Sequence, residues 1–172
     1  MSRRTLPSSP RTPPAGVIHQ HRRIFDDLRH DPYQARRKFA EPTVCADCGA
    51  VYHRGHWQRG EAPADAARAL CPACDRIRDR LPAGVVMIEG PFFAAHRDEI
   101  LRLVEHEAAR ERDTHPLARI MEIAPDAAGV VVTTTDIHLP QRIGEALRSA
   151  YHGELSVAYG KDEYSVRVDW RR

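Results

Sequence analysis

The sequence predicts an α+β protein in which a small module built on four cysteines precedes a domain with the element order α-β-β-α-β-β. Three observations support this prediction. The four cysteines, the only ones among 172 residues, lie in two Cys-x-x-Cys pairs. Two later stretches repeat apolar residues at helical spacing, and four shorter ones are typical of strands. A chain of this length makes one ordinary domain or two small ones.

The first forty residues are predicted to be an arm. Residues 1–16 are rich in Pro, Ser and Arg, a composition that predicts a disordered tail. Residues 17–40 form a basic helical arm with two short helical patterns, separated at Asp31 and Pro32. Its apolar side chains are too sparse for a stable free helix, so we expect this arm to become ordered only against a surface.

Residues 41–82 form the predicted cysteine module. Cys45 and Cys48 make the first pair, and Cys71 and Cys74 make the second. Two thiolates separated by two residues can hold one ion from a tight turn, and two such turns complete a tetrahedral site. The spacing therefore predicts a zinc ribbon with one structural Zn²⁺.

Other uses of these residues stay open. Two disulfides or two redox pairs would use the same four thiols, and iron can take the place of zinc, as in rubredoxins. His53 and His56 are further candidate ligands, although four thiolates already complete a closed structural site. Tyr52 and Trp57 are spaced as hairpin residues that cover a small metal core.

Residues 83–172 form the predicted α+β domain. It begins with a short β-branched run from Val85 to Ile88. Residues 92–114 repeat apolar side chains at helical spacing, and residues 117–123 and 130–135 are strand-like.

The end of the chain repeats this pattern. Residues 139–151 predict a second helix that ends near Gly153. Residues 155–159 and 164–170 alternate as two strands of a hairpin on either side of residues 160–163. The simplest assembly is a four-stranded sheet backed by two helices.

The positive charge is concentrated in the arm. Residues 1–40 hold nine Lys or Arg against three Asp, a net charge of +6, whereas the other 132 residues hold 17 against 21 Asp or Glu, a net charge of −4. Basic side chains bind phosphate, so this distribution favours a nucleic acid as partner. For Arg54 and Arg59, which lie between the cysteine pairs, a solvated loop is the alternative. The candidate contact residues are Arg22, Arg23, Arg29, Arg36, Arg37, Lys38, Arg54 and Arg59.

Signs of catalysis are missing from the sequence. There is no Gly-rich phosphate loop, no Gly-x-Ser-x-Gly and no His-Glu-x-x-His. Thr135 or Asp136 is interpreted as a helix cap, and Asp26, Asp27 and Asp31 lie in the arm without a fixed scaffold. We therefore expect no enzymatic activity and no small-molecule substrate.

The sequence also predicts a cytoplasmic protein without a membrane partner. No apolar stretch approaches the roughly 18–20 residues that span a bilayer, and residues 1–16 lack the apolar region of a secretory signal. A reducing compartment would keep four thiols available for a metal.

The motif EPTVCADCGAVYHRGHW, followed by CPAC, resembles the zinc-binding region of the archaeal and eukaryotic large-ribosomal-subunit export adaptor, the third nonsense-mediated-decay protein family. The tail GVVVTTTDIHLPQRIGEALRSAYHGELSVAYGKDEYSVRVDW is similar to the segment that follows that region. The resemblance spans residues 41–170 and is greatest to a group of small bacterial proteins that share both parts. It implies binding of structured RNA or the ribosome, with the four cysteines as metal ligands and no catalytic residue.

Two departures limit this resemblance. The archaeal and eukaryotic proteins carry further cysteine pairs for a second zinc and additional barrel-like domains, and this chain has neither. The leading hypothesis is a non-enzymatic zinc-binding adaptor for RNA, with ribosomal RNA or the ribosome as partner. The second is a protein-interaction or transcription-associated zinc ribbon, whose arm folds on a protein partner; the acidic composition after residue 40 favours it.

Overall fold

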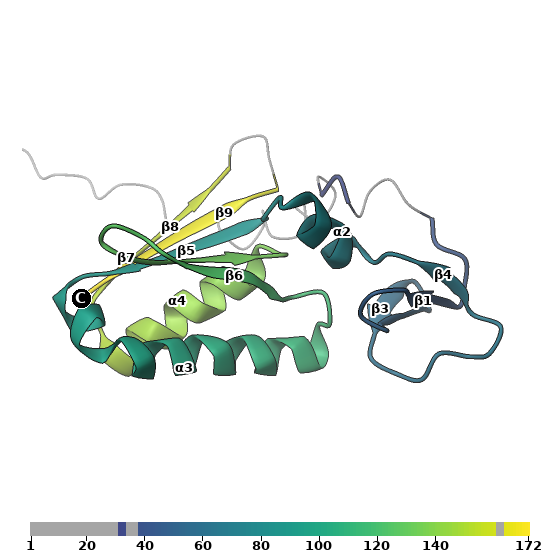
Figure 1. The fold of residues 1–172 in the computed structure, drawn as a ribbon, viewed down its shortest axis with the longest axis horizontal. Coiled ribbons are helices and arrows are strands. Elements are labelled where there is room, and N and C mark those ends of the chain that lie inside the picture. Colours follow the sequence, from purple (N-terminus) through teal and green to yellow (C-terminus); the bar gives the residue numbers. More distant parts are fainter. Residues whose placement is uncertain (1–30, 34–37, 161–163) are drawn as a thin grey trace, which may run out of the picture.

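The computed structural model describes residues 31–33, 38–160 and 164–172, which form two sheets and three helices (Figure 1). The fold class is therefore α+β, as the sequence predicts. The predicted disordered tail and most of the predicted helical arm lie outside the described residues. In the described part of the chain, no helix combines the length and the apolar character needed to cross a bilayer.

The first sheet is small, and the first cysteine pair lies at the end of one of its strands and in the turn that follows. Its strand order is β3-β2-β1-β4, and β4 pairs parallel to β1 while the other neighbours are antiparallel. We call it the small sheet. Its strands are β1 (Thr43–Cys45), β2 (Val51–His53), β3 (His56–Gln58) and β4 (Ala67–Ala69).

The predicted hairpin of aromatic residues is confirmed. Tyr52 of β2 lies opposite Trp57 of β3. The turn between them places Arg54 and Gly55 at φ of 54° and 79°, the left-handed conformation that a two-residue hairpin turn requires at both positions. The carboxylate of Glu41 accepts hydrogen bonds from both turn amides, at 2.7 and 3.0 Å. The side chain of Glu41, 13 residues before Arg54, therefore helps to fix this turn.

Helix α2 (Pro72–Asp79) follows the small sheet and was not expected from the sequence. Cys71 is its N-cap, and Pro72 occupies the first turn, where its missing N–H is no loss. Arg80, in the left-handed conformation, closes its C-terminal end. The second cysteine pair thus lies at a helix N-terminus.

The second sheet, which we call the large sheet, corrects the prediction of four strands. It has five strands in the order β6-β7-β5-β9-β8. The run after residue 83 is the central strand β5, which pairs antiparallel with β7 and parallel with β9. The strands are β5 (Gly84–Glu89), β6 (Ile120–Pro125), β7 (Gly129–Thr134), β8 (Glu154–Tyr159) and β9 (Val166–Arg171).

Two helices cover one face of the large sheet (Figure 1). They are α3 (Pro91–Thr114) and α4 (His138–Tyr151), within a residue of the predicted ranges. Alternate strand residues point to them, because a strand that packs one face on helices buries every second side chain. The predicted hairpin of the last two strands is also confirmed. The core includes Val86, Ile88, Ile100, Val132, Leu147, Val168 and Trp170.

A buried ion pair fixes the described part of the arm to α2. The guanidinium of Arg76 donates from Nη2 to Oδ1 of Asp31 at 2.6 Å, and both residues are buried. The rings of Tyr33 and Tyr164 lie 4.5 and 5.4 Å from the same guanidinium. The expectation that Asp31 lacks a fixed scaffold is therefore wrong, because α2 and the Tyr164 ring, two residues before β9, supply one.

Candidate metal centre

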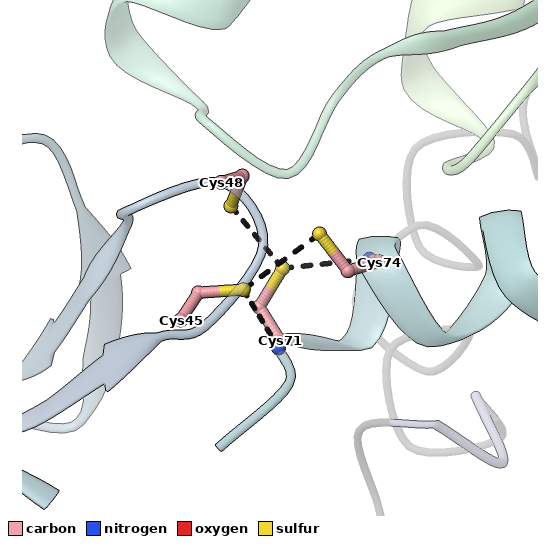
Figure 2. Close-up of side chains that lie close together, drawn as sticks. All are labelled: Cys45, Cys48, Cys71 and Cys74. Atoms are coloured by element: carbon pink, nitrogen blue, oxygen red, sulfur yellow. Dashed lines mark hydrogen bonds between the residues drawn. The ribbon is translucent and has the colours of Figure 1, made fainter. Parts of the chain in front are cut away.

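The four cysteine sulfurs converge between the small sheet and α2 (Figure 2). All four ligand atoms lie within 4.8 Å of one another, and all four thiols are free of disulfides. Cys45, Cys71 and Cys74 are buried, whereas Cys48 is partly exposed. Cys45 and Cys48 form the first hook, and Cys71 and Cys74 form the second. The two hooks are separated in sequence but bring their sulfurs into one cluster.

The sulfur separations fit a tetrahedral metal site. Sγ of Cys45 lies 3.7 Å from Sγ of Cys74, and Sγ of Cys48 lies 3.7 Å from Sγ of Cys71. Four sulfurs at about 2.3 Å from a central zinc would lie about 3.8 Å apart. A disulfide would instead bring two sulfurs to about 2.0 Å. The site is thus shaped to hold a metal ion.

The first hook is a tight turn after β1. The amide of Gly49 donates to the carbonyl of Cys45 at 3.0 Å, and the amide of Cys45 donates to the carbonyl of Ala50 at 2.7 Å. Gly49 has a φ of 73°, which a residue with a side chain rarely adopts. The glycine after the second cysteine of this hook therefore lets the turn close.

The second hook uses the N-terminus of α2. The Cys74 amide donates to Sγ of Cys71 at 3.4 Å, and the Cys71 amide donates to Sγ of Cys45 at 3.3 Å. Unpaired amides and the helix dipole give this end of a helix a partial positive charge. Both effects favour thiolates over thiols.

Arg119 lies between α3 and β6, and its side chain contacts the sulfurs of the candidate metal site. Its Nη2 donates to Sγ of Cys71 at 3.4 Å and to Sγ of Cys74 at 3.3 Å. Thr135 fixes its backbone, because the Arg119 amide donates to the Thr135 hydroxyl at 2.9 Å and the Thr135 amide donates to the Arg119 carbonyl at 3.0 Å. A cation from the large-sheet region thus offsets part of the thiolate charge.

The thiol pKa values diverge because the sulfurs are so close. The hydrogen bond from Cys71 lowers the pKa of Cys48 to about 4, although burial acts in the opposite direction. The same hydrogen bond, followed by burial, raises the pKa of Cys71, and burial raises the pKa of Cys74. In the metal-free protein, one sulfur of the Cys48–Cys71 pair therefore carries the charge and its partner keeps the proton.

The histidines between the hooks do not join the sulfurs. Nδ1 of His56 lies 3.1 Å from the Arg54 carbonyl, and Nδ1 of His53 lies 3.9 Å from the Glu41 carboxylate; both side chains are exposed. Among the described residues, the ligand cluster consists of the four cysteines.

The predicted phosphate contacts are placed only in part. Lys38 and Arg54 are exposed, and Arg54 lies at the tip of the β2–β3 hairpin. Arg59 forms an ion pair of 2.6 Å with Asp113 of α3, which joins the small sheet to that helix. The other five candidates lie outside the described residues: Arg22, Arg23, Arg29, Arg36 and Arg37.

Comparison of the chain with known proteins found no matching family model and no matching curated protein. The resemblance to the export-adaptor family is therefore a prediction from the motifs quoted above.

Replacing Arg119 with alanine is expected to lower the Zn²⁺ affinity by about 10- to 100-fold, the usual effect of losing a group that hydrogen-bonds to a metal ligand. Competition with a chromogenic chelator measures this affinity. Replacing the exposed Arg112 of α3 with alanine is the matched control and should leave the affinity unchanged. Equal affinities of the two variants would show that the contact to Cys71 and Cys74 has no effect on the metal.

Proposed function

We propose that this protein is a non-enzymatic zinc-ribbon adaptor that binds RNA in the cytoplasm, with ribosomal RNA or the ribosome as partner. In this proposal a basic arm leads into a ribbon, and the ribbon precedes the α+β domain. The protein acts by binding and has neither a membrane partner nor a small-molecule substrate.

Zinc is proposed as the ion because four thiolates make a closed tetrahedral site of the structural kind. When bound, the ion supplies stability to a module with little apolar core. The ion would be held by Cys45, Cys48, Cys71 and Cys74. The aromatic rings of the hairpin pack in the same cluster as these cysteines. Iron in the same site would make the purified protein red, whereas the zinc form is colourless.

The observation that carries the RNA proposal is the uneven charge. The first forty residues have a net charge of +6, and the buried pair of Asp31 and Arg76 ties the end of this basic segment to α2. Lys38 and Arg54 are exposed and available to a phosphate backbone.

One observation favours the alternative of a protein partner. Ile77 and Leu81, at the end of α2, are 39% and 55% exposed, and apolar side chains of this size are common in protein interfaces. The residues after position 40 also have a net charge of −4, which repels phosphate. On this alternative the arm would fold on a protein instead of RNA.

Deleting residues 1–30 tests the RNA proposal. The deletion removes six arginines and two aspartates but keeps Asp31, so the metal content and melting temperature should be retained. Affinity for RNA at low salt should fall by at least about tenfold, since each phosphate contact contributes about 0.7 to the slope of log affinity against log salt. Fluorescence anisotropy of labelled ribosomal RNA fragments over a salt series measures the affinity for RNA and its dependence on salt.

Charge reversal provides a matched pair of variants. Changing Arg36, Arg37 and Lys38 to glutamate should weaken RNA binding in the same way. The control changes three exposed arginines of α3 and should leave RNA binding nearly unchanged: Arg102, Arg110 and Arg112 to glutamate. If the full chain shows no salt-sensitive RNA binding, or if both triple variants bind alike, the charge distribution does not reflect an RNA site.

A further inference from the structure

A cleft of about 900 Å³ lies between the small sheet and the two helices that cover the large sheet. One wall comes from the β2–β3 hairpin and the residues that precede β1. The opposite wall comes from the end of α3, the loop after it and the first turns of α4. A volume of this size accommodates a ligand of a few hundred daltons.

The small-sheet wall is aromatic. The ring centroids of Phe39, Tyr52 and Trp57 lie 5.0 to 5.5 Å apart. All three residues line the cleft; Phe39 and Tyr52 are partly exposed, whereas Trp57 is nearly buried. Aromatic rings of this kind offer a stacking platform to a flat ligand.

The opposite wall is basic at its rim. Arg142 and His115 line the cleft with side chains that are 60% and 64% exposed. Each is held in place by the buried Glu111, whose Oε2 lies 2.8 Å from Nε of Arg142 and whose Oε1 lies 2.9 Å from Nδ1 of His115. His138 also lies on this wall and adds a second imidazole to it.

The floor is acidic. Glu111 lies there, and Asp136 accepts the amides of His138 and Leu139 at 3.0 and 3.3 Å through Oδ2. Oδ1 of Asp136 is buried and has no hydrogen-bond partner. Burial raises the pKa of this carboxyl, which the two amides only partly oppose. Oδ1 therefore lacks the hydrogen bond that a buried carboxylate oxygen normally accepts, and the negative charge of Glu111 disfavours a phosphate in this part of the cleft.

We propose that this cleft takes one unpaired nucleotide of an RNA strand, with the base between the aromatic wall and the floor and the phosphate at the rim beside Arg142. The proposal rests on the RNA-binding function proposed above. The acid floor and basic rim set the orientation of the nucleotide, and the amino group of a base is a donor for the carboxylates. The cleft therefore adds a preference for unpaired RNA to the sequence-independent attraction of the arm.

The probes are a labelled ten-nucleotide single-stranded RNA and a duplex of the same length. Changing Tyr52 to leucine keeps an apolar side chain but removes the stacking ring. It is expected to weaken binding of the single strand by about 5- to 100-fold, the effect of losing a base–aromatic stack. Binding of the duplex should not change. The single strand should also quench the fluorescence of Trp57, whereas Trp170 is completely buried in the core.

A second variant guards against misfolding of the first. Changing Arg142 to glutamine removes the rim cation from an exposed position of α4 and should weaken single-strand binding by about tenfold at low salt. The matched control is Arg148 to glutamine, on the same helix, which pairs with Glu145 and does not line the cleft. The Arg148 variant should keep the melting temperature of the parent protein. The Arg142 variant should still unfold in one cooperative transition, because His115 remains beside Glu111.

The outcomes separate the two proposals. If the parent protein binds RNA while the Tyr52 and Arg142 variants match it and the Arg148 control, the cleft proposal is overturned and the RNA-binding function stands. If the parent protein binds neither RNA, both proposals fail. If an arginine-rich peptide quenches Trp57 and the single strand does not, the cleft takes a protein partner and the nucleotide proposal is overturned.

Discussion

Replacing Cys71 with serine is expected to release the metal and unfold the small sheet, while most of residues 83–172 stay folded. Cys71 is the most buried of the four cysteines, and its sulfur lies 3.7 Å from Cys48 and accepts hydrogen bonds from Cys74 and Arg119. Serine offers a harder, neutral oxygen in place of a thiolate. Metal binding contributes about 10–16 kcal/mol to the folding of zinc-finger peptides, so a small module cannot replace it.

The large sheet should survive because it has its own core. The buried apolar residues of the large sheet and its helices form one cluster, and the cysteines and hairpin aromatics form another. Elemental analysis should show one zinc per parent chain and none in the variant. Thermal unfolding followed by circular dichroism should keep the main transition. Chelation of the parent protein should give the same result. Iron, no metal, or a variant that still binds one zinc would each contradict this prediction.

Replacing Asp31 with alanine is expected to destabilise the protein by about 3–5 kcal/mol, the cost of leaving one member of a buried ion pair without its partner. The side chains of Arg76 and Asp31 are only 5% and 3% exposed. Among the described residues, Asp31 supplies the carboxylate that pairs with the Arg76 guanidinium, at 2.6 Å. Because water cannot reach it, the Arg76 charge would remain buried without compensation. Chemical denaturation of the two proteins measures the difference.

The same helix supplies the control. Arg78 of α2 pairs with Asp47 at 2.9 Å, but their side chains are 58% and 37% exposed. Replacing Asp47 with alanine should therefore cost about 0–1 kcal/mol. Replacing Asp31 with leucine and Arg76 with methionine together should recover most of the lost stability, since apolar residues can substitute for a buried pair. Equal effects of the Asp31 and Asp47 changes would show that the buried pair does not hold the arm.

Local patterns predicted most of the elements. The cysteine spacing predicted the convergence of the two hooks, and helical periodicity placed α3 and α4 within a residue of their observed starts. The aromatic hairpin and the final strand pair were also predicted, because each depends on residues that are close in sequence.

What the sequence did not predict depends on distant partners. The run from Val85 to Ile88 is too short to identify by itself as a strand, and its central position follows from parallel pairing with β9, some eighty residues later. Arg119 and Arg76 carry no local signal, because each finds its partner about 45 residues away. For the same reason, Asp31 was expected to lack a fixed scaffold.

Sedimentation of the native protein through a sucrose gradient tests the central proposal most directly. At low salt, the protein is expected to sediment with ribosomal particles. It should move to the top of the gradient after nuclease treatment or in high salt, because phosphate contacts from the arm dominate the interaction. A protein that stays at the top under all conditions would contradict the proposal. So would one that keeps a large partner after the RNA has been digested, which would establish a protein as its partner.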